Sequence, residues 1–402
     1  MLYSLNTYIV TKNFQQRETE GNALNKKEIL EIKRRLKKEG CTFTRMCGCY
    51  VDGEHNRVTR LGKTFLNLDE EEFFKYLDLA KKVLSGTVGN NLLELEFPLE
   101  EEEQDGRQQF LLGLRESKLK SEELLERFYD LIIENYYYSG NYLILVFHDA
   151  YDVPLKTKDH RNLDESEEIY EYLLCAICPV TLSKPGLGYL EDSNEIGLRL
   201  RDWVVGVPDA GFVFPAFTER STDIHAALFY TKNAKEPPIE LIEGVLGCDK
   251  KMTATEQKEV FRSVLEDALG EESSYETIKE IHDKIQEKII DHANNTDKNE
   301  EPEPLELSKD MIKEILNGSG ISEEKITQTE HEYEKKVGEA KLYAENVVDQ
   351  RRFEVKTYDV VLHVKPEKAA QIKSQIIDGQ KCLVIPMDSN ENINVNGIHT
   401  TV

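Results

Sequence analysis

The chain has 402 residues, of which 39% are hydrophobic and 32% are charged. This composition excludes a wholly disordered chain, a fibre and a disulfide-rich mini-protein, and the length corresponds to two or three domains. With 51 Lys and Arg against 76 Asp and Glu, the formal net charge is −25. A chain this acidic is repelled by nucleic acid and by anionic membranes unless a local basic patch overrides the repulsion.

The sequence predicts a cytoplasmic protein. Its longest apolar run, around Tyr142–Phe147, is far shorter than the ~20 residues of a membrane span. Met1–Phe14 has no basic stretch leading into an apolar core, so no signal peptide is predicted. The seven cysteines are odd in number and scattered, whereas secreted disulfide frameworks are dense and usually even.

The first half of the chain predicts an α+β core domain over residues 25–247. Residues 1–24 are polar and aperiodic, and we expect a disordered extension there. A helix is predicted from Asn25, where a capping box precedes an apolar stripe. A β-hairpin, two further helical stretches and a run of short strands follow, which favours an antiparallel or mixed sheet with flanking helices. The strands of that run are predicted at Tyr142–Phe147, Tyr170–Thr181, Trp203–Val207, Phe212–Phe217 and Ile224–Tyr230.

The second half predicts a change of architecture. Capping boxes at Thr253 and Ser273 begin amphipathic helices, and we expect a helical region over residues 253–348. Within it, residues 292–307 are acidic and contain two prolines, which is typical of a linker. Residues 352–402 alternate in the manner of strands and predict a small β-rich C-terminal module.

Several motifs in order resemble an uncharacterised family of Firmicute proteins, domain-of-unknown-function family 4317. They are Asn25–Ile29, Cys47–Val51, Gly140–Ile144 running into His148–Pro154, Cys175–Pro179, Asp202–Val205 and Phe214–Phe217. The resemblance implies no activity, cofactor or partner. Members typically place Met directly before the Asn-Lys-Lys-Glu run, and here Leu24 stands at that place. The resemblance therefore implies that residues 1–23 come from a mis-assigned start codon.

The first candidate site is the cluster His148, Asp149 and Asp152, which follows an apolar strand. An imidazole beside two carboxylates suits a divalent cation or a base oriented by an acid. The alternative is structural: the carboxylates make turn hydrogen bonds ahead of Pro154, and the histidine packs at the sheet edge. Arg220 or Glu219 is a further candidate neighbour of this cluster.

The second candidate site consists of four cysteines, Cys47, Cys49, Cys175 and Cys178. Four thiolates are the number that a structural zinc site requires. On strands, however, Cys47 and Cys49 share a face, whereas Cys175 and Cys178 point to opposite faces. The alternative is that these thiols are small core residues.

Two glycine-containing segments and one basic helix bear on the binding of phosphate groups or nucleic acid. The segments Ser85–Asn91 and Pro185–Gly188 lack the strand-to-helix order of a phosphate loop, so no cofactor site is predicted and the cofactor stays unknown. The basic helix 25–39 is the one candidate contact for nucleic acid, but no aromatic residue interleaves with its cations. We favour a role against the protein's own acidic surfaces, such as Glu100–Glu103 or Glu165–Glu171, or against a protein partner.

Two functional hypotheses follow. The first is a non-catalytic interaction or scaffold protein with an unknown protein partner, because no strong catalytic or cofactor motif occurs and the surface is strongly acidic. The second is a hydrolase or metal-dependent enzyme centred on His148, Asp149 and Asp152.

Overall fold

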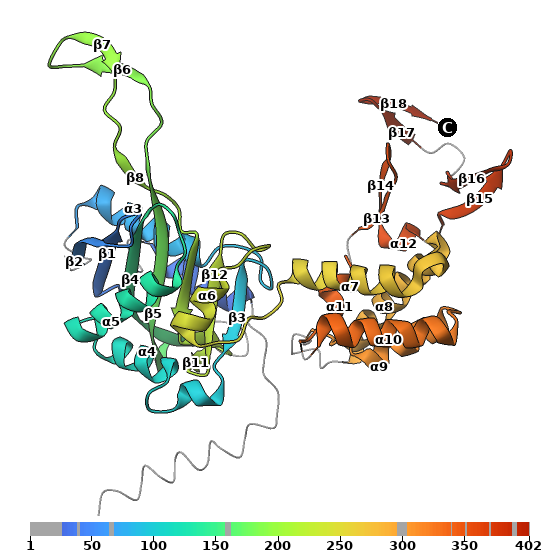
Figure 1. Cartoon of the computed structure of the whole chain (residues 1–402), viewed down its shortest axis with the longest axis horizontal. Coiled ribbons are helices and arrows are strands. Elements are labelled where there is room, and N and C mark those ends of the chain that lie inside the picture. Colours follow the sequence, from blue (N-terminus) through green and yellow to red (C-terminus); the bar gives the residue numbers. More distant parts are fainter. Residues whose placement is uncertain are drawn as a thin grey trace, which may run out of the picture. The chain divides into compact units, whose positions relative to one another are not determined.

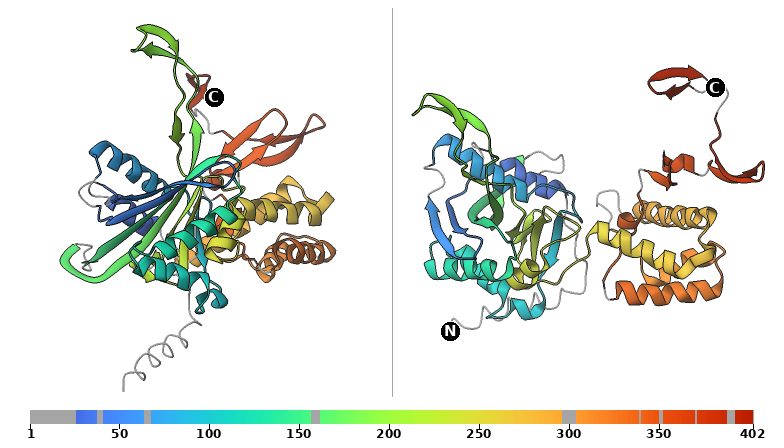
Figure 2. Two further views of the ribbon diagram at one scale, coloured as in Figure 1. Left: turned by 60° about the vertical axis from the view of Figure 1, so that its left-hand side comes forward. Right: turned by 45° about the horizontal axis from the view of Figure 1, so that its top comes forward.

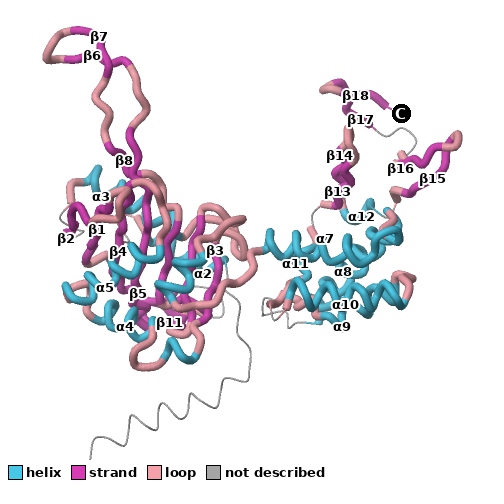
Figure 3. The backbone as a smooth tube through the Cα atoms, viewed as in Figure 1, coloured by secondary structure: helices cyan, strands magenta, loops and turns pink. Residues whose placement is uncertain are grey.

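The computed structural model describes the chain in nine stretches (Figures 1 and 3), and residues 1–25, with the whole of the predicted extension, lie outside them. The described residues are 26–37, 41–63, 68–156, 162–295, 304–338, 340–349, 352–369, 371–387 and 392–401. The chain divides into two compact units, residues 1–253 and 254–402. Helices and antiparallel strands occur in both units, which confirms the α+β class.

Unit 1 is built on one eight-stranded sheet with the order β2-β1-β4-β5-β9-β12-β3, in which β8 pairs with the far end of β5. Every strand pair in it is antiparallel, so the antiparallel form of the predicted sheet is the correct one. The strands are β1 (Arg45–Val51), β2 (Arg57–Lys63), β3 (Leu92–Glu96), β4 (Asn141–Lys156), β5 (Asn162–Leu182), β8 (Trp203–Val205), β9 (Ala210–Phe214) and β12 (Ala226–Thr231).

Helices cover both faces of this sheet (Figure 2). We call the side packed by α2 (Lys26–Arg35) and α3 (Glu70–Val83) the α2 face, and the side packed by α4 (Arg107–Glu116) and α5 (Glu122–Asn135) the α4 face. Two apolar clusters, one on each face, form the core, because alternate residues of each strand point to opposite sides. The shorter helical elements are η2 (Leu99–Glu102), α6 (Ile239–Leu241) and the π-helical turn η3 (Ile242–Leu246).

The strand that begins at Tyr142 does not end at Phe147, and this corrects the expected turn. Strand β4 continues to Lys156, paired throughout with β5. The reason is that the alternation persists: Tyr151 and Val153 are still buried on the α2 face. His148, Asp149 and Asp152 therefore lie within a regular strand.

Beyond the sheet, β5 and β8 extend into a projecting two-stranded arm, which we define as residues 182–207 (Figures 1 and 2). Its outer part pairs β6 (Leu187–Leu190) with β7 (Glu195–Leu198). Between the paired ends, Ser183 accepts hydrogen bonds from Arg201 and Asp202, which keep the two chains together. A separate small hairpin, β10 (Ala216–Thr218) with β11 (Ser221–Asp223), lies at the opposite end of β5.

Unit 2 contains helices followed by three two-stranded hairpins. The amphipathic helix predicted after Ser273 is α8, in which Ile281, Ile285 and Ile289 are buried and Ile278 is exposed. The helix carrying it ends at Asn295, inside the predicted linker, and residues 296–303 lie outside the described residues. The elements are α7 (Ala254–Leu269), η4 (Gly270–Glu272), α8 (Tyr275–Asn295), α9 (Lys309–Gly318), α10 (Glu323–Val337), α11 (Ala344–Val347), β13 (Phe353–Lys356), β14 (Val361–Val364), α12 (Pro366–Ala369), β15 (Lys373–Ile377), β16 (Gln380–Val384), β17 (Asn392–Val395) and β18 (Ile398–Thr401).

Among the helices described in either unit, none combines the length and the apolar character that a membrane span needs.

Candidate functional site

His148 lies on the α4 face and is fully buried. Its Nε2 is 2.8 Å from Oε1 of Glu171 on β5, and its Nδ1 is 3.1 Å from the hydroxyl of Thr44. Because a carboxylate only accepts hydrogen bonds, the network assigns the proton to Nε2 and makes Nδ1 the acceptor for Thr44. Burial lowers the pKa of His148, although the hydrogen bond to Glu171 opposes this effect. The neutral ring thus holds Glu171 in place and is itself closed to solvent.

Asp149 points to the other side of the sheet, because adjacent residues of a strand face opposite ways. It is buried on the α2 face, where it accepts hydrogen bonds from the hydroxyls of Thr42 and Tyr172, the latter at 2.6 Å. Nη1 of Arg35 lies 3.9 Å from its Oδ2. The structure therefore does not bring His148 and Asp149 together, and Asp149 accepts its backbone hydrogen bond, from the amide of Ala150 at 3.0 Å, within a strand and not in the expected turn.

Asp152 is on the same face as His148 but is exposed. It pairs with Ile169 on β5, whereas His148 pairs with Leu173, so the two residues are separated along the strand. Arg220 lies on the α2 side instead, where its guanidinium binds Glu31 at 2.8 Å and the carbonyl of Pro154 at 3.0 Å. The three members of the predicted cluster thus occupy three different environments.

The four cysteines also remain apart. Cys47, Cys49 and Cys175 belong to the core of the α4 face, whereas Cys178 belongs to that of the α2 face. Cys47 and Cys175 are both paired with Val146 of β4, one from each side. Two strand spacings, about 10 Å, therefore separate their backbones, which is too far for one zinc ion. Within the described part of the chain, no three His, Cys, Asp or Glu side chains are grouped as a metal would require.

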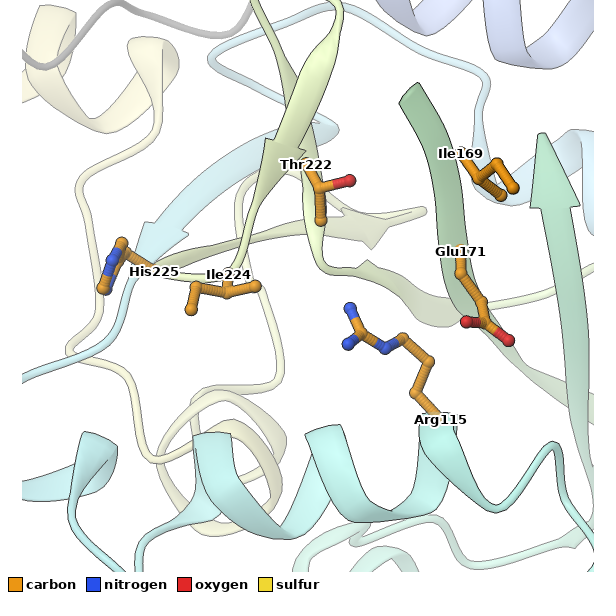
Figure 4. Close-up of a pocket in the computed structure, with 6 residues that line it drawn as sticks. All are labelled: Arg115, Ile169, Glu171, Thr222, Ile224 and His225. Atoms are coloured by element: carbon orange, nitrogen blue, oxygen red, sulfur yellow. The ribbon is translucent and has the colours of Figure 1, made fainter. Parts of the chain in front are cut away.

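A pocket of about 420 Å³ opens beside Glu171 on the α4 face (Figure 4). Arg115 projects into it from the last turn of α4, and Glu171 lines it from β5. Ile169 and Ile224 supply apolar walls. The remaining lining residues are Thr222 and His225. The volume lies in the lower part of the range for small-molecule sites, roughly 300–1,000 Å³.

The two charged side chains in this pocket do not neutralise each other, since no ion pair within 4.0 Å joins Arg115 to Glu171. Nε of Arg115 is buried without a hydrogen-bond partner, and among the described residues its guanidinium forms an ion pair only with exposed Glu116, at 3.9 Å from Nη2. Glu171 uses Oε1 for both His148 and Lys118, at 2.8 and 3.5 Å. The pocket is thus lined by a guanidinium that forms no close ion pair with a described residue and by a carboxylate whose Oε2 makes no hydrogen bond to a described residue.

Sequence reasoning missed Arg115 and Glu171, although a signal for each existed. Arg115 continues the buried stripe of Gln108 and Leu111 at spacings of three and four. Glu171 is a single carboxylate between buried Tyr170 and Tyr172. Charged residues at core positions are rare unless they are paired or functional, so both positions were informative.

The comparisons with known proteins give one result that bears on identity. A family model described as a domain of unknown function (DUF4317) matches residues 24–398. The chain belongs to the DUF4317 family. A search of curated proteins finds no match to it. For this DUF4317 protein, neither comparison assigns an activity to the fold or to the pocket.

Several polar contacts hold the basic helix of the DUF4317 chain against the rest of unit 1, whereas the side chains of residues 162–167, within one of the acidic segments expected for it, lie outside the described ones. Glu28 and Glu31 on α2 receive the backbone amide and the side chain of Arg220, and Lys33 donates to Ser85 at 2.6 Å. Partial burial lowers the pKa of Lys33, and the nearby charges of Lys82 and Lys81 lower it further. The contacts described here are intramolecular, and docking of this helix on Glu100–Glu103, on Glu165–Glu171 or on a protein partner stays a prediction.

The arm is the second candidate feature. Antiparallel pairing places Leu187 opposite Leu198 and Tyr189 opposite Ile196, so these four side chains form one apolar face. The reverse face carries the facing pair Gly188 and Gly197. In all, ten large apolar residues of the arm are exposed, by 37 to 88%: Leu182, Leu187, Tyr189, Ile196, Leu198, Leu200, Trp203, Val204, Val205 and Val207.

Proposed function

We propose that this protein is a non-catalytic interaction protein that docks a protein partner on the apolar face of its arm. The observation that carries the proposal is the concentration of exposed apolar side chains on residues 182–207. Monomeric proteins rarely expose contiguous apolar patches of this kind without a binding role. The ribbon also leaves backbone donors and acceptors free along its edges, which suits strand addition by a partner.

Charge indicates what kind of partner fits. The arm has three basic and four acidic residues and is nearly neutral, whereas the whole chain has a net charge of −25. A second copy of the chain would bring a body of the same sign toward this one, and like charges oppose association. We therefore propose a partner that offers an apolar groove bordered by basic residues. The free thiols of all seven cysteines support placing this interaction in the cytoplasm.

The test uses a photo-crosslinking amino acid in the full-length protein, expressed in its native host. One probe replaces Tyr189 on the apolar face, and a control probe replaces Tyr137, which is 76% exposed outside the arm. We expect a single basic protein to be crosslinked from Tyr189 and not from Tyr137. Binding of that purified protein should weaken as the salt concentration rises.

A matched pair of variants makes the test specific. The double substitution Leu187→Ser and Ile196→Ser should weaken binding at least a hundredfold, since each side chain is worth roughly 1.5–3 kcal/mol when buried. Glu195→Gln, on the reverse face, should leave affinity within about twofold. Equal binding by both variants would refute the proposal. A homodimer that the double variant dissolves would instead identify a second copy as the occupant.

A further inference from the structure

The pocket beside Glu171 has the components of a site for a small zwitterion, and this is independent of the arm. It is enclosed by α4, by β5 and by the segment that follows β11, with Arg115 at its centre (Figure 4). A ligand here would lie between a cation and an anion that belong to different elements and do not bond each other.

The cation is the first anchor. Arg115 has 14% of its side chain exposed, and its Nε has no hydrogen-bond partner. A buried, unsatisfied donor is costly, and a guanidinium edge binds a planar carboxylate through two parallel hydrogen bonds. The carboxylate of Glu171 lines the same pocket and opposes the binding of a strongly negative ligand. A singly charged carboxylate therefore fits better than a doubly charged phosphate.

The second anchor is Glu171. Its Oε1 is occupied by His148 and Lys118, and its Oε2 makes no hydrogen bond to any described residue. His148 is fixed on both ring nitrogens, so it keeps the carboxylate oriented toward the pocket. A carboxylate held in this way accepts hydrogen bonds from an ammonium group. Orienting Glu171 is therefore a role for buried His148 that requires no catalytic function.

We propose that the pocket binds a free α-amino acid, with its carboxylate on Arg115, its ammonium group on Oε2 of Glu171 and its side chain against Ile169 and Ile224. The apolar walls favour an aliphatic side chain. The cavity of about 420 Å³ admits a ligand of this size.

The experiment is isothermal titration of the full-length protein with three matched probes. L-leucine carries both charges, L-leucinamide lacks the carboxylate, and 4-methylpentanoate lacks the ammonium group. We expect one leucine per chain, and binding at least about tenfold weaker for each of the other two, because each loses a charged hydrogen-bonding group. A thermal-shift panel of the other natural amino acids at 10 mM covers side-chain preference.

Variants assign the binding to the two anchors. Arg115→Gln should abolish leucine binding, and Arg115→Lys should weaken it at least about tenfold, because it keeps the charge and loses the planar fork. Glu171→Gln should reduce leucine to the affinity of 4-methylpentanoate. Glu116→Gln, which removes the exposed neighbouring carboxylate, should leave binding intact or improve it.

If Arg115→Gln fails to fold, Arg115→Lys and the probe series decide the matter. No binding by any amino acid at 10 mM would overturn the proposal. Equal binding of leucine and leucinamide, or unchanged binding in the folded Arg115 variants, would overturn it as well.

Discussion

Replacing Asp149 by Asn should destabilise unit 1 strongly, although the two side chains have nearly the same shape. Only 2% of the Asp149 side chain is exposed, and it accepts hydrogen bonds from two hydroxyls and from the amide of Ala150 at 3.0 Å. The substitution removes the charge from these bonds. It also leaves Nη1 of Arg35, which is buried without a hydrogen-bond partner, with no counter-ion.

The expected cost follows from these contacts. A hydrogen bond to a charged acceptor is worth about 1 kcal/mol more than one to a neutral acceptor, and the two hydroxyl bonds both lose that difference. An unpaired Arg35 adds a further 1–2 kcal/mol or so, moderated because Arg35 also stacks on the ring of Tyr151 at 3.7 Å. We therefore expect a loss of about 3 kcal/mol in the free energy of unfolding, or a decrease of about 6–12 °C in Tm.

The assay is native-state hydrogen exchange on the full-length protein, followed on peptides from β4. Asp152→Asn is the matched control, because it makes the same change on an exposed residue of the same strand, and it should cost less than about 0.5 kcal/mol. In a double-mutant cycle, Arg35→Met and Asp149→Asn should couple by at least about 1 kcal/mol. Equal costs for the two Asn variants, or additivity in the cycle, would refute the reasoning.

Three further predictions concern other parts of the protein. Because burial lowers the pKa of His148 in the folded chain, the unfolded chain takes up the proton first, so stability is kept above pH 6.5 and declines below it, by up to about 1.4 kcal/mol per pH unit; urea unfolding at pH 7.5 and 5.5 should show a shallower decline for His148→Gln, and parallel declines would contradict this. In alkylation followed by mass spectrometry, half-exposed Cys382 should react in the native protein, whereas Cys175, whose pKa is raised by complete burial, should react only after unfolding; rapid labelling of Cys175 would show that its strand opens. Gly211→Ala should cost roughly 1–3 kcal/mol, because its Cβ would lie 2.4 Å from the carbonyl oxygen of Cys175, whereas Gly62→Ala, with nothing within 4 Å, should be nearly neutral in thermal unfolding; similar Tm values for the two variants would count against the packing described.

Local signals in the sequence were sufficient for much of the fold. The β-hairpin predicted after the first helix is that of β1 and β2, and α3 is one of the helical stretches predicted to follow it. The hairpin of β15 and β16, with its turn at Asp378 and Gly379, lies in the β-rich module predicted over residues 352–402. In each case the decisive interactions lie within a few residues of one another.

The features that the sequence did not predict depend on contacts between residues far apart in the chain. The polar end of β4 looks like a turn, and only its register with β5 makes it a strand. Pro185–Gly188 looks irregular because the pairing of β6 with β7 depends on the opposite chain of the arm. The pocket also depends on topology: Arg115 and Glu171 are 56 positions apart in the printed sequence and meet only because α4 packs beside β5.

The adjacency of His148 and Asp149 has a mechanical consequence. A single peptide unit of β4 links the polar group behind the pocket to the polar group beneath α2, and Glu171 and Tyr172 repeat this arrangement on β5. The two polar groups therefore lie on opposite faces of the same two strands and are joined through their backbones. A twist of β4 and β5 that reorients Glu171 also displaces the hydroxyl of Tyr172 on the opposite face, so a change in the pocket is coupled to the hydrogen bonds of Asp149.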